Sequence, residues 1–336
     1  MKNRQGIEFL QHFSGARVAV VGDVMLDIYL WGQVSRISPE APVPVVNVNR
    51  RTSCLGGAAN VMRNLRTLGA AAFAYGVVGN DNLGRELAEN LRELGIDDSG
   101  LFFDDARRTT EKRRVVAGSQ QLLRIDVEDT FEVDDSIRRK IVDGVISRIR
   151  AKELDAVIFE DYNKGLLSAW MLEEIICAAR EHNVITALDP KPGSLAPVKG
   201  LSVMKPNRVE AFALAGMADD NSMCDVRDNS LLAQVAEKLL DTWEPDLLLL
   251  SLASQGMALF RRGQEVEVIP TRAREVFDVS GAGDTVTATY TVSAISGAPA
   301  RTAAEIANRA AGVVVGKVGT APILFDELIK SFDSEE

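Results

Sequence analysis

The chain has few of the residues that build metal sites and disulfide frameworks. It contains three cysteines and two histidines among 336 residues. Cys54, Cys177 and Cys224 are odd in number and lack metal-ligand spacing, which suits a reduced, cytoplasmic protein. His12 and His182 have no Cys or His neighbour in register, so a zinc site of the usual kind is excluded.

Long apolar runs and an excess of positive charge are also missing. No stretch of about twenty apolar residues could span a membrane, and residues 1–6 carry no apolar run after their charges, so we expect no signal peptide. The formal net charge of −10 disfavours nucleic acid and an anionic membrane as partners, because both would repel the chain. A phosphorylated substrate would therefore need a local basic cluster. With 46% hydrophobic residues, the chain can bury a sizeable core.

What the chain does contain is a glycine-rich segment that ends in an acid, Gly281-Ala282-Gly283-Asp284. Successive backbone amides that no side chain covers can bind an anion, as the start of a helix does. Asp284, beside these donors, could accept the proton of an attacking hydroxyl while the amides hold the charge of a moving phosphoryl group. The alternative is an ordinary acid in the first turn of a helix.

Two widely separated motifs resemble the signatures of one enzyme family. Gly281-Ala282-Gly283-Asp284, preceded by Asp278, resembles the C-terminal signature of the ribokinase-like (PfkB) carbohydrate kinases, and residues 55–61 through Gly69 resemble the N-terminal one. The resemblance implies phosphoryl transfer from ATP to a sugar hydroxyl, with Asp284 as the base and Gly281, Ala282 and Gly283 as the anion hole. Four further stretches resemble the branch of the family that phosphorylates the anomeric hydroxyl of a heptose 7-phosphate for lipopolysaccharide synthesis, namely 21–27, 35–46, 120–126 and 310–317.

Alternating strand and helix patterns predict a mostly parallel sheet covered by helices. The resemblance implies a single kinase domain over residues 1–336, an α/β ribokinase-like three-layer sandwich with a small β-sheet lid from about 31–50 and 112–118. Pro42 and Pro44 exclude a helix or a central strand in the first lid segment, so an edge strand remains. Exposed edges need covering, and in the family such lids pair between subunits, so we expect a homodimer through the lid.

Polar residues at a predicted strand end and a predicted helix start are candidates for sugar binding. Asp23 and Asp27 follow the first strand, at the edge where open α/β sheets place ligands. Gly56 and Gly57 let the main chain approach a ligand, and Asn60 in the first turn can donate to and accept from a polyol. An Asx turn at Asp27 and a helix-start amide at Asn60 are the alternatives, and the resemblance favours ligand binding.

The densest basic cluster could bind the phosphate of a sugar phosphate. Lys112 and Arg114 point to one face if they lie on a strand. A solvated edge strand guarded by charges is the alternative, which we prefer for Arg107 and Arg108. Arg36 is a separate candidate for the phosphate.

Two later strands also end in charged residues. Glu160 and Asp161 close one strand and Asp189 the next, with Lys164 and Lys191 close behind. Charges of both signs at one sheet edge are typical of a polar binding crevice. The resemblance places Asp161 and Lys164 near the substrate side.

The residues expected at the nucleotide come mainly from the resemblance. Asn207 and Glu210 lie in a Pro-Asn-x-x-Glu motif, which the spacing alone explains as a capping box. In the family these two residues hold Mg²⁺ through waters, as suits a strongly hydrated cation, and both interpretations can be true. The other positions expected at ATP are Ser251, Gly256, Gly281, Gly283 and Asn308, and a K⁺ ion is expected near Asp278 and Ser280.

For residues 285–292, the sequence pattern and the family resemblance predict different secondary structures. Residues 285–292 alternate polar and apolar side chains, which predicts a strand. The family has a helix there. We expect the helix, because an anion hole needs amides that converge at a helix start.

Rival functions differ from the kinase hypothesis at particular residues. Another sugar or sugar-phosphate kinase of this fold would lack the matches at 35–46 and 120–126, and a catalytically idle sensor would be expected to lose Asp284 or its glycines. A dinucleotide-dependent oxidoreductase is disfavoured, because the first strand runs into Gly22-Asp23-Val24-Met25 rather than a Gly-x-Gly-x-x-Gly turn. Relatives fused to a nucleotidyltransferase would need a His-x-Gly-His type motif, and no histidine follows His182, so we expect kinase activity only.

Overall fold

The computed structural model describes residues 6–118, 120–222, 224–272, 276–317 and 319–333. Most of the segment on which we predict no signal peptide, residues 1–5, lies outside the described residues. In the described part of the chain, no helix is both long enough and apolar enough to cross a membrane. The cytoplasmic location stays a prediction.

Short apolar runs form the large sheet, as the sequence predicts. In β1 (Arg17–Gly22) every residue after Arg17 is buried, because alternate side chains point to opposite faces and helices cover both faces. The other strands of this sheet are β4 (Ala71–Gly79), β5 (Asp97–Asp104), β8 (Ala156–Glu160), β9 (Ile185–Asp189), β10 (Val203–Met204), β11 (Leu248–Ser251), β12 (Met257–Phe260) and β13 (Glu267–Ile269). Their order is β13-β12-β11-β10-β9-β8-β1-β4-β5, and the pairs are parallel except for β11 with β12 and β12 with β13.

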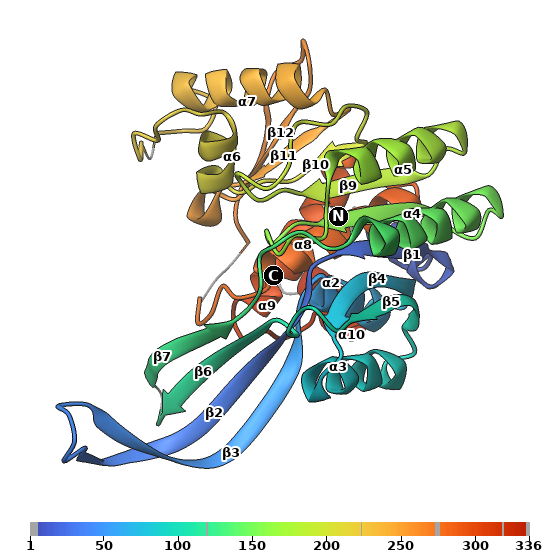
Figure 1. The fold of residues 1–336 in the computed structure, drawn as a ribbon. Helices are drawn as coiled ribbons and strands as arrows, with labels where there is room; N and C mark the ends of the chain where they lie inside the picture. Colours follow the sequence, from blue (N-terminus) through green and yellow to red (C-terminus); the bar gives the residue numbers. More distant parts are fainter. Residues whose placement is uncertain (1–5, 119, 223, 273–275, 318, 334–336) are drawn as a thin grey trace.

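Two sets of helices cover the two faces of the large sheet, and each set packs its own apolar core (Figure 1). Val18 and Val20 of β1 belong to one core, and Ala19 and Val21 to the other. The first set consists of α2 (Ala58–Thr67), α3 (Asn82–Glu93), α8 (Ala282–Ile295), α9 (Ala300–Val314) and α10 (Phe325–Asp333). The second set consists of α4 (Asp135–Arg150), α5 (Ala169–Glu181), α6 (Arg208–Leu214) and α7 (Ser230–Trp243). Short turns of helix, α1 (Ile7–Leu10), η2 (Phe13–Gly15) and η3 (Ala253–Gln255), complete the elements.

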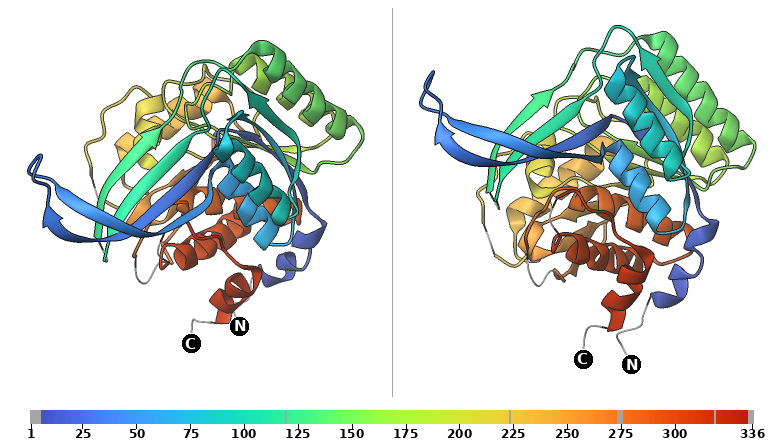
Figure 2. Two further views of the ribbon diagram at one scale, coloured as in Figure 1. Left: turned by 60° about the horizontal axis from the view of Figure 1, so that its bottom comes forward. Right: turned by 90° about the horizontal axis from the view of Figure 1, so that it is seen from below.

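A second sheet of four strands forms the lid and projects from the body of the molecule (Figure 2). Its order is β3-β2-β6-β7, and its strands are β2 (Val24–Ile37), β3 (Pro44–Gly57), β6 (Glu111–Ala117) and β7 (Gln120–Val127). The pair of β2 with β6 is parallel, while β3 and β7 run antiparallel to their neighbours.

The lid is larger than the sequence predicts. We predict lid segments at 31–50 and 112–118, whereas β2 and β3 have 14 residues each and β7 lies beyond the second segment. Residues 24–29 are buried and apolar apart from Asp27, so their sequence is typical of a core strand rather than of a lid. Six of the eight residues of β7 are exposed, although Leu123, Ile125 and Val127 alternate with polar residues as in a strand.

Candidate active site

The glycine-rich segment forms the start of α8. Gly281 is the N-cap residue with φ +78°, a conformation that a side chain would strain, and a Cβ there would lie 2.7 Å from the side-chain nitrogen of Asn60. Gly283 and Asp284 follow in the first helical turn, where backbone amides have no acceptor within the helix. These amides can therefore bind an anion, as the anion-hole prediction requires.

Residues 285–292 form a helix, as the family resemblance implies, and not the strand that the alternating pattern predicts. Every residue from 284 to 293 is buried, so alternation of polar and apolar residues does not separate an inner from an outer face. Two of the buried hydroxyls donate to carbonyls one turn earlier, Thr287 to Gly283 at 3.1 Å and Ser293 to Thr289 at 2.7 Å. Such bonds let hydroxyl residues fill a buried helix, and this is why the periodicity fails here.

Asp284 is buried and held by one donor on each carboxylate oxygen. Its Oδ2 accepts from Asn60 Nδ2 at 2.7 Å, and its Oδ1 accepts from the Tyr162 hydroxyl at 2.6 Å. Burial raises the pKa of Asp284, while the hydrogen bonds from Tyr162 and Asn60 lower it. The result is an oriented carboxylate of increased basicity next to the anion-binding amides.

A buried ion pair lies directly beside the anion hole. Lys205 Nζ is 2.7 Å from Asp189 Oδ2, and a Cβ added to Gly283 would lie 3.4 Å from the same Nζ. Burial raises the pKa of Asp189 to about 6, against the opposing effect of Lys205. The ammonium therefore stands where the charge of a phosphoryl group at the start of α8 would be stabilised.

Glu160, at the end of β8, adds a fully buried carboxyl to this region. Neither of its oxygens has a hydrogen-bond partner among the described residues. Burial, and after it the charges of Asp189 and Asp284, raise the pKa of Glu160 well above its usual range. Burial without a hydrogen-bond partner therefore disfavours the charged form of this side chain.

Asp27 lies in a network that joins the lid to the C-terminal part of the chain. Its Oδ1 is 2.6 Å from Arg114 Nη1, and its Oδ2 accepts from Thr320 Oγ1 at 2.9 Å. Both side chains of the ion pair are almost completely buried. β6 is a strand, as expected, but the charge of Arg114 is already balanced by Asp27.

The two predicted glycines permit close contacts with Asp27 and with Asp23. A Cβ at Gly56 would lie 2.8 Å from Asp27 Oδ2, and one at Gly57 would lie 2.6 Å from the Asp23 carbonyl oxygen. Gly57 has φ +56° and is the N-cap of α2, whose first turn carries Asn60. Gly56 therefore permits the close approach of Asp27, Gly57 permits that of the Asp23 carbonyl, and α2 directs Asn60 to Asp284.

Three predicted sugar ligands use their polar atoms to hold loops. Asp23 Oδ2 accepts from the backbone amides of Tyr162 at 2.9 Å and Lys164 at 3.0 Å, and burial raises the pKa of Asp23 to about 6. Asp161 accepts from the amide of Asn163 and from the hydroxyl of Ser194. The Lys164 ammonium pairs with Glu128 at 2.7 Å.

Sugar binding by these three side chains stays a prediction, and the structure shows a second use for each of them. An acid that directly follows a parallel strand faces the amides of the next loop and binds them first. Asp23 and Asp161 shape the loops around the site, and the charge of Lys164 is balanced.

The two remaining basic candidates lie in different places. Lys112 is on β6 opposite Asp27, with Nζ 5.4 Å from the centre of the Tyr162 ring. Arg36 is exposed near the far end of β2, nine residues beyond Asp27, which is about 30 Å along an extended strand. The structure keeps Lys112 as a candidate for a substrate phosphate and does not bring Arg36 to the site.

On the nucleotide side, Asn207 and Glu210 form the capping box of α6. The Asn207 side chain accepts from the Glu210 amide at 2.9 Å, and the Glu210 carboxylate accepts from the Asn207 amide at 2.9 Å. The second carboxylate oxygen of Glu210 is 3.0 Å from Lys191 Nζ. No cluster of three or more His, Cys, Asp or Glu able to hold a metal occurs among the described residues, so a metal here would rely on waters and phosphate oxygens.

The other residues expected at ATP lie on three separate elements. Ser251 ends β11 and pairs with Asn207 in an isolated bridge. Gly256 has φ +84°, and a Cβ there would overlap the backbone before Thr271. Asn308 of α9 donates to the Pro270 carbonyl at 2.6 Å.

The loop expected to bind K⁺ is folded on the carboxylate of Asp278. One oxygen accepts from the Ser280 amide at 2.9 Å, and the other accepts from the Gly319 amide at 3.1 Å. Asp278 therefore ties the segment before α8 to the segment after α9. The K⁺ site stays a prediction.

Three residues of this site are absent from the sequence-based candidates: Tyr162, Lys205 and Thr320. Lys205 directly precedes the Pro-Asn-x-x-Glu motif and directly follows β10, and a charged residue just after a strand is a signal that sequence analysis can use. Tyr162 lies between two charged candidates. No local pattern marks Thr320, because its contact with Asp27 spans 293 residues.

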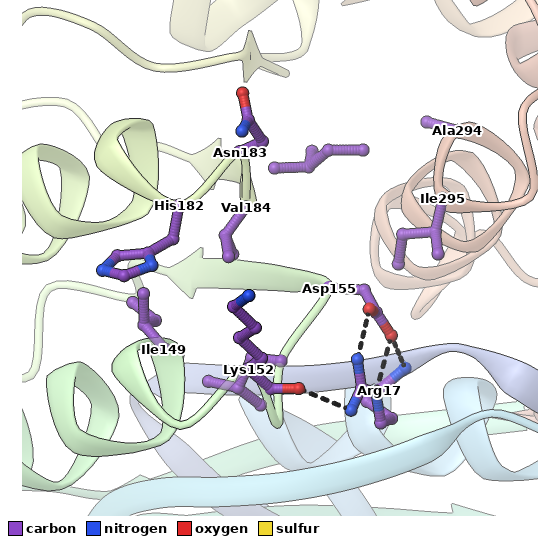
Figure 3. A pocket seen from close by; sticks show the side chains of 11 residues that line it. Arg17, Ile149, Lys152, Asp155, His182, Asn183, Val184, Ala294 and Ile295 are labelled. Carbon is purple, nitrogen blue, oxygen red and sulfur yellow. Dashed lines mark hydrogen bonds and ion pairs between the residues drawn. The ribbon is translucent and has the colours of Figure 1, made fainter.

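A cavity of about 440 Å³ lies elsewhere in the molecule (Figure 3). It is lined by residues at the amino ends of β1 and β9 and at the last turn of α8, including Arg17, Ile185 and Ile295. An ion pair between Arg17 and Asp155, 2.7 Å apart, closes one side. The cavity thus lies at the amino ends of these strands, near the end of α8, whereas Asp284 lies at the start of that helix. None of the predicted site residues lines the cavity.

Comparison with known proteins gives concordant results. Residues 16–326 match the family model described as pfkB family carbohydrate kinase. The Bifunctional protein HldE of Desulfatibacillum aliphaticivorans is 43% identical over 311 residues, which are 93% of this chain and 62% of that protein. The Bifunctional protein HldE of Geobacter sulfurreducens is 41% identical over 329 residues, 98% of this chain and 65% of that protein. The chain thus spans less than two thirds of the length of these relatives.

Two solved structures show the same fold. An Arabidopsis thaliana ribokinase complexed with ribose and ATP aligns with a TM-score of 0.70 at 20% identity, over 94% of this chain and 98% of that one. The phosphofructokinase-2 of Escherichia coli in complex with potassium aligns with a TM-score of 0.75 at 16% identity, over 95% and 98%. The predicted ribokinase-like α/β architecture with a small second sheet is confirmed.

Proposed function

The chain belongs to the pfkB family of carbohydrate kinases, and on that premise we propose that it phosphorylates D-glycero-β-D-manno-heptose 7-phosphate at the anomeric oxygen. The product would be the 1,7-bisphosphate of the ADP-heptose branch of lipopolysaccharide core synthesis. The observation that carries the kinase chemistry is Asp284, held by Asn60 and Tyr162 beside the amides that open α8. The substrate assignment is supported by the four stretches that resemble the heptose branch and by the HldE relatives.

In the proposed reaction, Asp284 accepts the proton of the anomeric hydroxyl as its oxygen attacks the γ-phosphorus of ATP. The bond between this phosphorus and the bridging oxygen breaks, and ADP leaves with the electron pair. The amides of Gly283 and Asp284 and the ammonium of Lys205 hold the charge of the moving group. Burial of Asp284 supports this role, because it raises the pKa of the base toward the working pH.

Recognition of the sugar phosphate is assigned to the lid side of the site. Asp27 can accept from sugar hydroxyls while Arg114 and Thr320 fix its position. Lys112 lies opposite Asp27 on the neighbouring strand, with its Nζ 5.4 Å from the centre of the Tyr162 ring. We assign the 7-phosphate to Lys112, with Arg114 as its neighbour two residues along the same strand.

Mg²⁺ fits this site only as a hydrated ion carried by ATP. Asn207 and Glu210 face the nucleotide side, but their polar atoms already form the capping box and a contact with Lys191. They would therefore hold the ion through its waters. When bound, Mg²⁺ would neutralise part of the charge on the ATP phosphates. Dependence on K⁺ near Asp278 and Ser280 is a proposal of the same kind, tested by replacing K⁺ with tetramethylammonium.

Assembly through the lid is also proposed. The lid strands and the turn between β2 and β3 expose large apolar side chains, namely Val34, Ile37, Val43, Val48, Leu123 and Ile125. A second copy would cover them. Light scattering at micromolar concentration should give the mass of a dimer, and a monomeric mass would count against this assembly.

The function is tested by measuring ADP release over a panel of acceptors that includes heptose 7-phosphate, fructose 6-phosphate, ribose and heptose without phosphate. We expect kcat/KM to be highest for the heptose 7-phosphate and to fall at least tenfold when the 7-phosphate is absent, because a charged contact is lost. A higher value for another phosphorylated sugar would favour the alternative, a different sugar-phosphate kinase of this family. Kinase activity without a second activity stays a prediction.

A further inference from the structure

We propose that Tyr162 is a positioning residue for the catalytic base, with its hydroxyl fixing both the orientation and the charge state of the Asp284 carboxylate. The inference rests on the proposed role of Asp284 as the proton acceptor. It adds a residue outside the glycine-rich motif, 122 residues away from the base in the chain.

The contact geometry supports this role. The Tyr162 hydroxyl donates to Asp284 Oδ1 over 2.6 Å, while Asn60 donates to the other oxygen over 2.7 Å. With one donor on each oxygen, the plane of the carboxylate is fixed and rotation would break both bonds. Each oxygen has a second lone pair, so a substrate hydroxyl can still donate to the carboxylate.

The loop that carries Tyr162 is built to aim it. The Tyr162 and Lys164 amides both donate to Asp23 Oδ2, and the intervening Asn163 has φ +56°, with its own amide bound to Asp161. Asp23, after β1, and Asp161, after β8, thus both accept hydrogen bonds from the backbone of this one loop. Three loop amides bind these two carboxylates although Asp23 must be buried to do so, which indicates that the structure holds Tyr162 in a defined position.

The phenol acts as a donor and keeps its proton. Burial raises the pKa of Tyr162 well above its usual value, and the charges of Asp284, Glu160 and Asp189 raise it further. The proton taken from the sugar therefore resides on Asp284, and Tyr162 stays neutral throughout. A hydrogen bond to the ionised form lowers the pKa of the carboxyl it serves.

Other charged groups around Asp284 also influence its pKa. Those that face it are Asp27 on β2, Arg63 on α2, Glu160 on β8, Asp189 on β9 and Lys205 after β10. On α9, which also packs on α8, Arg301 pairs with Glu305, and Arg309 donates to the Ser331 carbonyl. None of these groups donates to Asp284 Oδ1 in the described residues, so the bond from Tyr162 can be removed by itself.

The test is the pH dependence of kcat/KM in Tyr162→Phe. Without the donor, the pKa of the base rises, so the acid limb should move up by about one pH unit, with about a tenfold loss of kcat/KM below the limb. Above the limb, where the base is ionised in both proteins, the remaining decrease in kcat/KM measures the lost orientation of the carboxylate. An unmoved limb, whether activity is unchanged or lowered at every pH, overturns the proposal.

A second variant covers the case in which Tyr162→Phe does not fold. Replacing Tyr162 by 3-fluorotyrosine keeps the shape of the side chain and makes the hydroxyl a stronger donor, so the acid limb should move down. A limb that stays in place or moves up in this variant contradicts the proposal. Tyr75→Phe is the matched control, because this buried tyrosine lies in the core on the other face of the sheet and should leave the limb unmoved.

Failure of this proposal can be told apart from failure of the proposed function. The profile is recorded with whichever sugar phosphate the panel identifies, so an error in the substrate does not affect it. If Asp284→Asn leaves turnover nearly intact, the base assignment fails. If Asp284→Asn abolishes turnover and the limb of Tyr162→Phe stays unmoved, only the role of Tyr162 fails.

Discussion

The sugar side and the nucleotide side of this site are built differently. On the sugar side, buried groups pair over long distances in the chain: Asp284 with Asn60 across 224 residues, and Asp27 with Thr320 across 293. On the nucleotide side, Asn207 and Glu210 pair across three residues, and Asp278 and Ser280 across two. The first kind of contact exists only after folding is complete, while the second forms within a single turn.

This difference has energetic consequences. A buried pair made by distant segments leaves an uncompensated charge when one partner is removed. A capping interaction at a helix end is partly replaced by water when it is removed. Substitutions that remove the partner of a buried charge on the sugar side should therefore lower stability strongly, and loss of a cap on the nucleotide side should lower it more weakly.

The largest effect is expected for Asp284→Asn. The amide cannot accept the hydroxyl proton, so kcat should fall at least about 100-fold in the ADP-release assay. The buried hydrogen bonds can be kept by the amide, so the melting temperature should change little. A decrease of less than about tenfold, roughly 1.4 kcal/mol of barrier, would show that Asp284 is not the base.

Next in size is the loss of stability expected for Arg114→Met. The substitution leaves Asp27 buried without its cation, which should lower the free energy of unfolding by about 3 kcal/mol in urea titrations. Arg139→Met is the matched control, because Arg139 forms an exposed pair with Glu174 and its loss should cost far less stability. Equal losses in the two variants would mean that the Asp27 pair is not a special feature of the sugar side.

A smaller effect should be seen in the pH dependence of stability through Asp23. Because burial raises the pKa of this group in the folded state to about 6, ionisation costs stability as the pH rises from about 4 through 6. Between pH 5 and 7, this group should lower the free energy of unfolding by about 1.3 kcal/mol relative to an ordinary aspartate. Asp23→Asn should remove that decrease.

The control for Asp23 is Asp246→Asn, an exposed aspartate paired with Arg180. This variant controls for the general effect of removing one aspartate charge. If Asp23→Asn instead keeps the slope of the parent, the carboxyl is not the source of the pH dependence.

The smallest effect is expected for Asn207→Ala, on the nucleotide side. Loss of the N-cap should lower the free energy of unfolding by about 1 kcal/mol. Asn229→Ala removes the N-cap of α7 and should cost about the same. If Asn207 also serves Mg²⁺ and ATP, KM for ATP should rise in the first variant only. An unchanged KM in both would leave Asn207 as a helix cap alone.

Much of this site was predictable because its signals are local. The capping box at Asn207 and Glu210 follows from a spacing of three residues, and the strand ends follow from apolar runs that stop at charged residues. The start of α8 follows from glycines beside an acid. Periodicity failed in the same helix, because polar and apolar residues from 284 to 293 are all buried and some of its hydroxyls, those of Thr287 and Ser293, bond to its own carbonyls.

The chain by itself determined which residue types lie at the edge of the large sheet and that one of them could act as a base beside an anion hole. Tertiary structure alone decided which acids are available for chemistry. Asp23 and Asp161 are used by loop amides, Asp27 is neutralised by Arg114, and Asp284 is aimed by Asn60 and Tyr162. The reason is that a carboxylate binds the donors that folding brings to it, and those donors come from segments whose proximity no local pattern records.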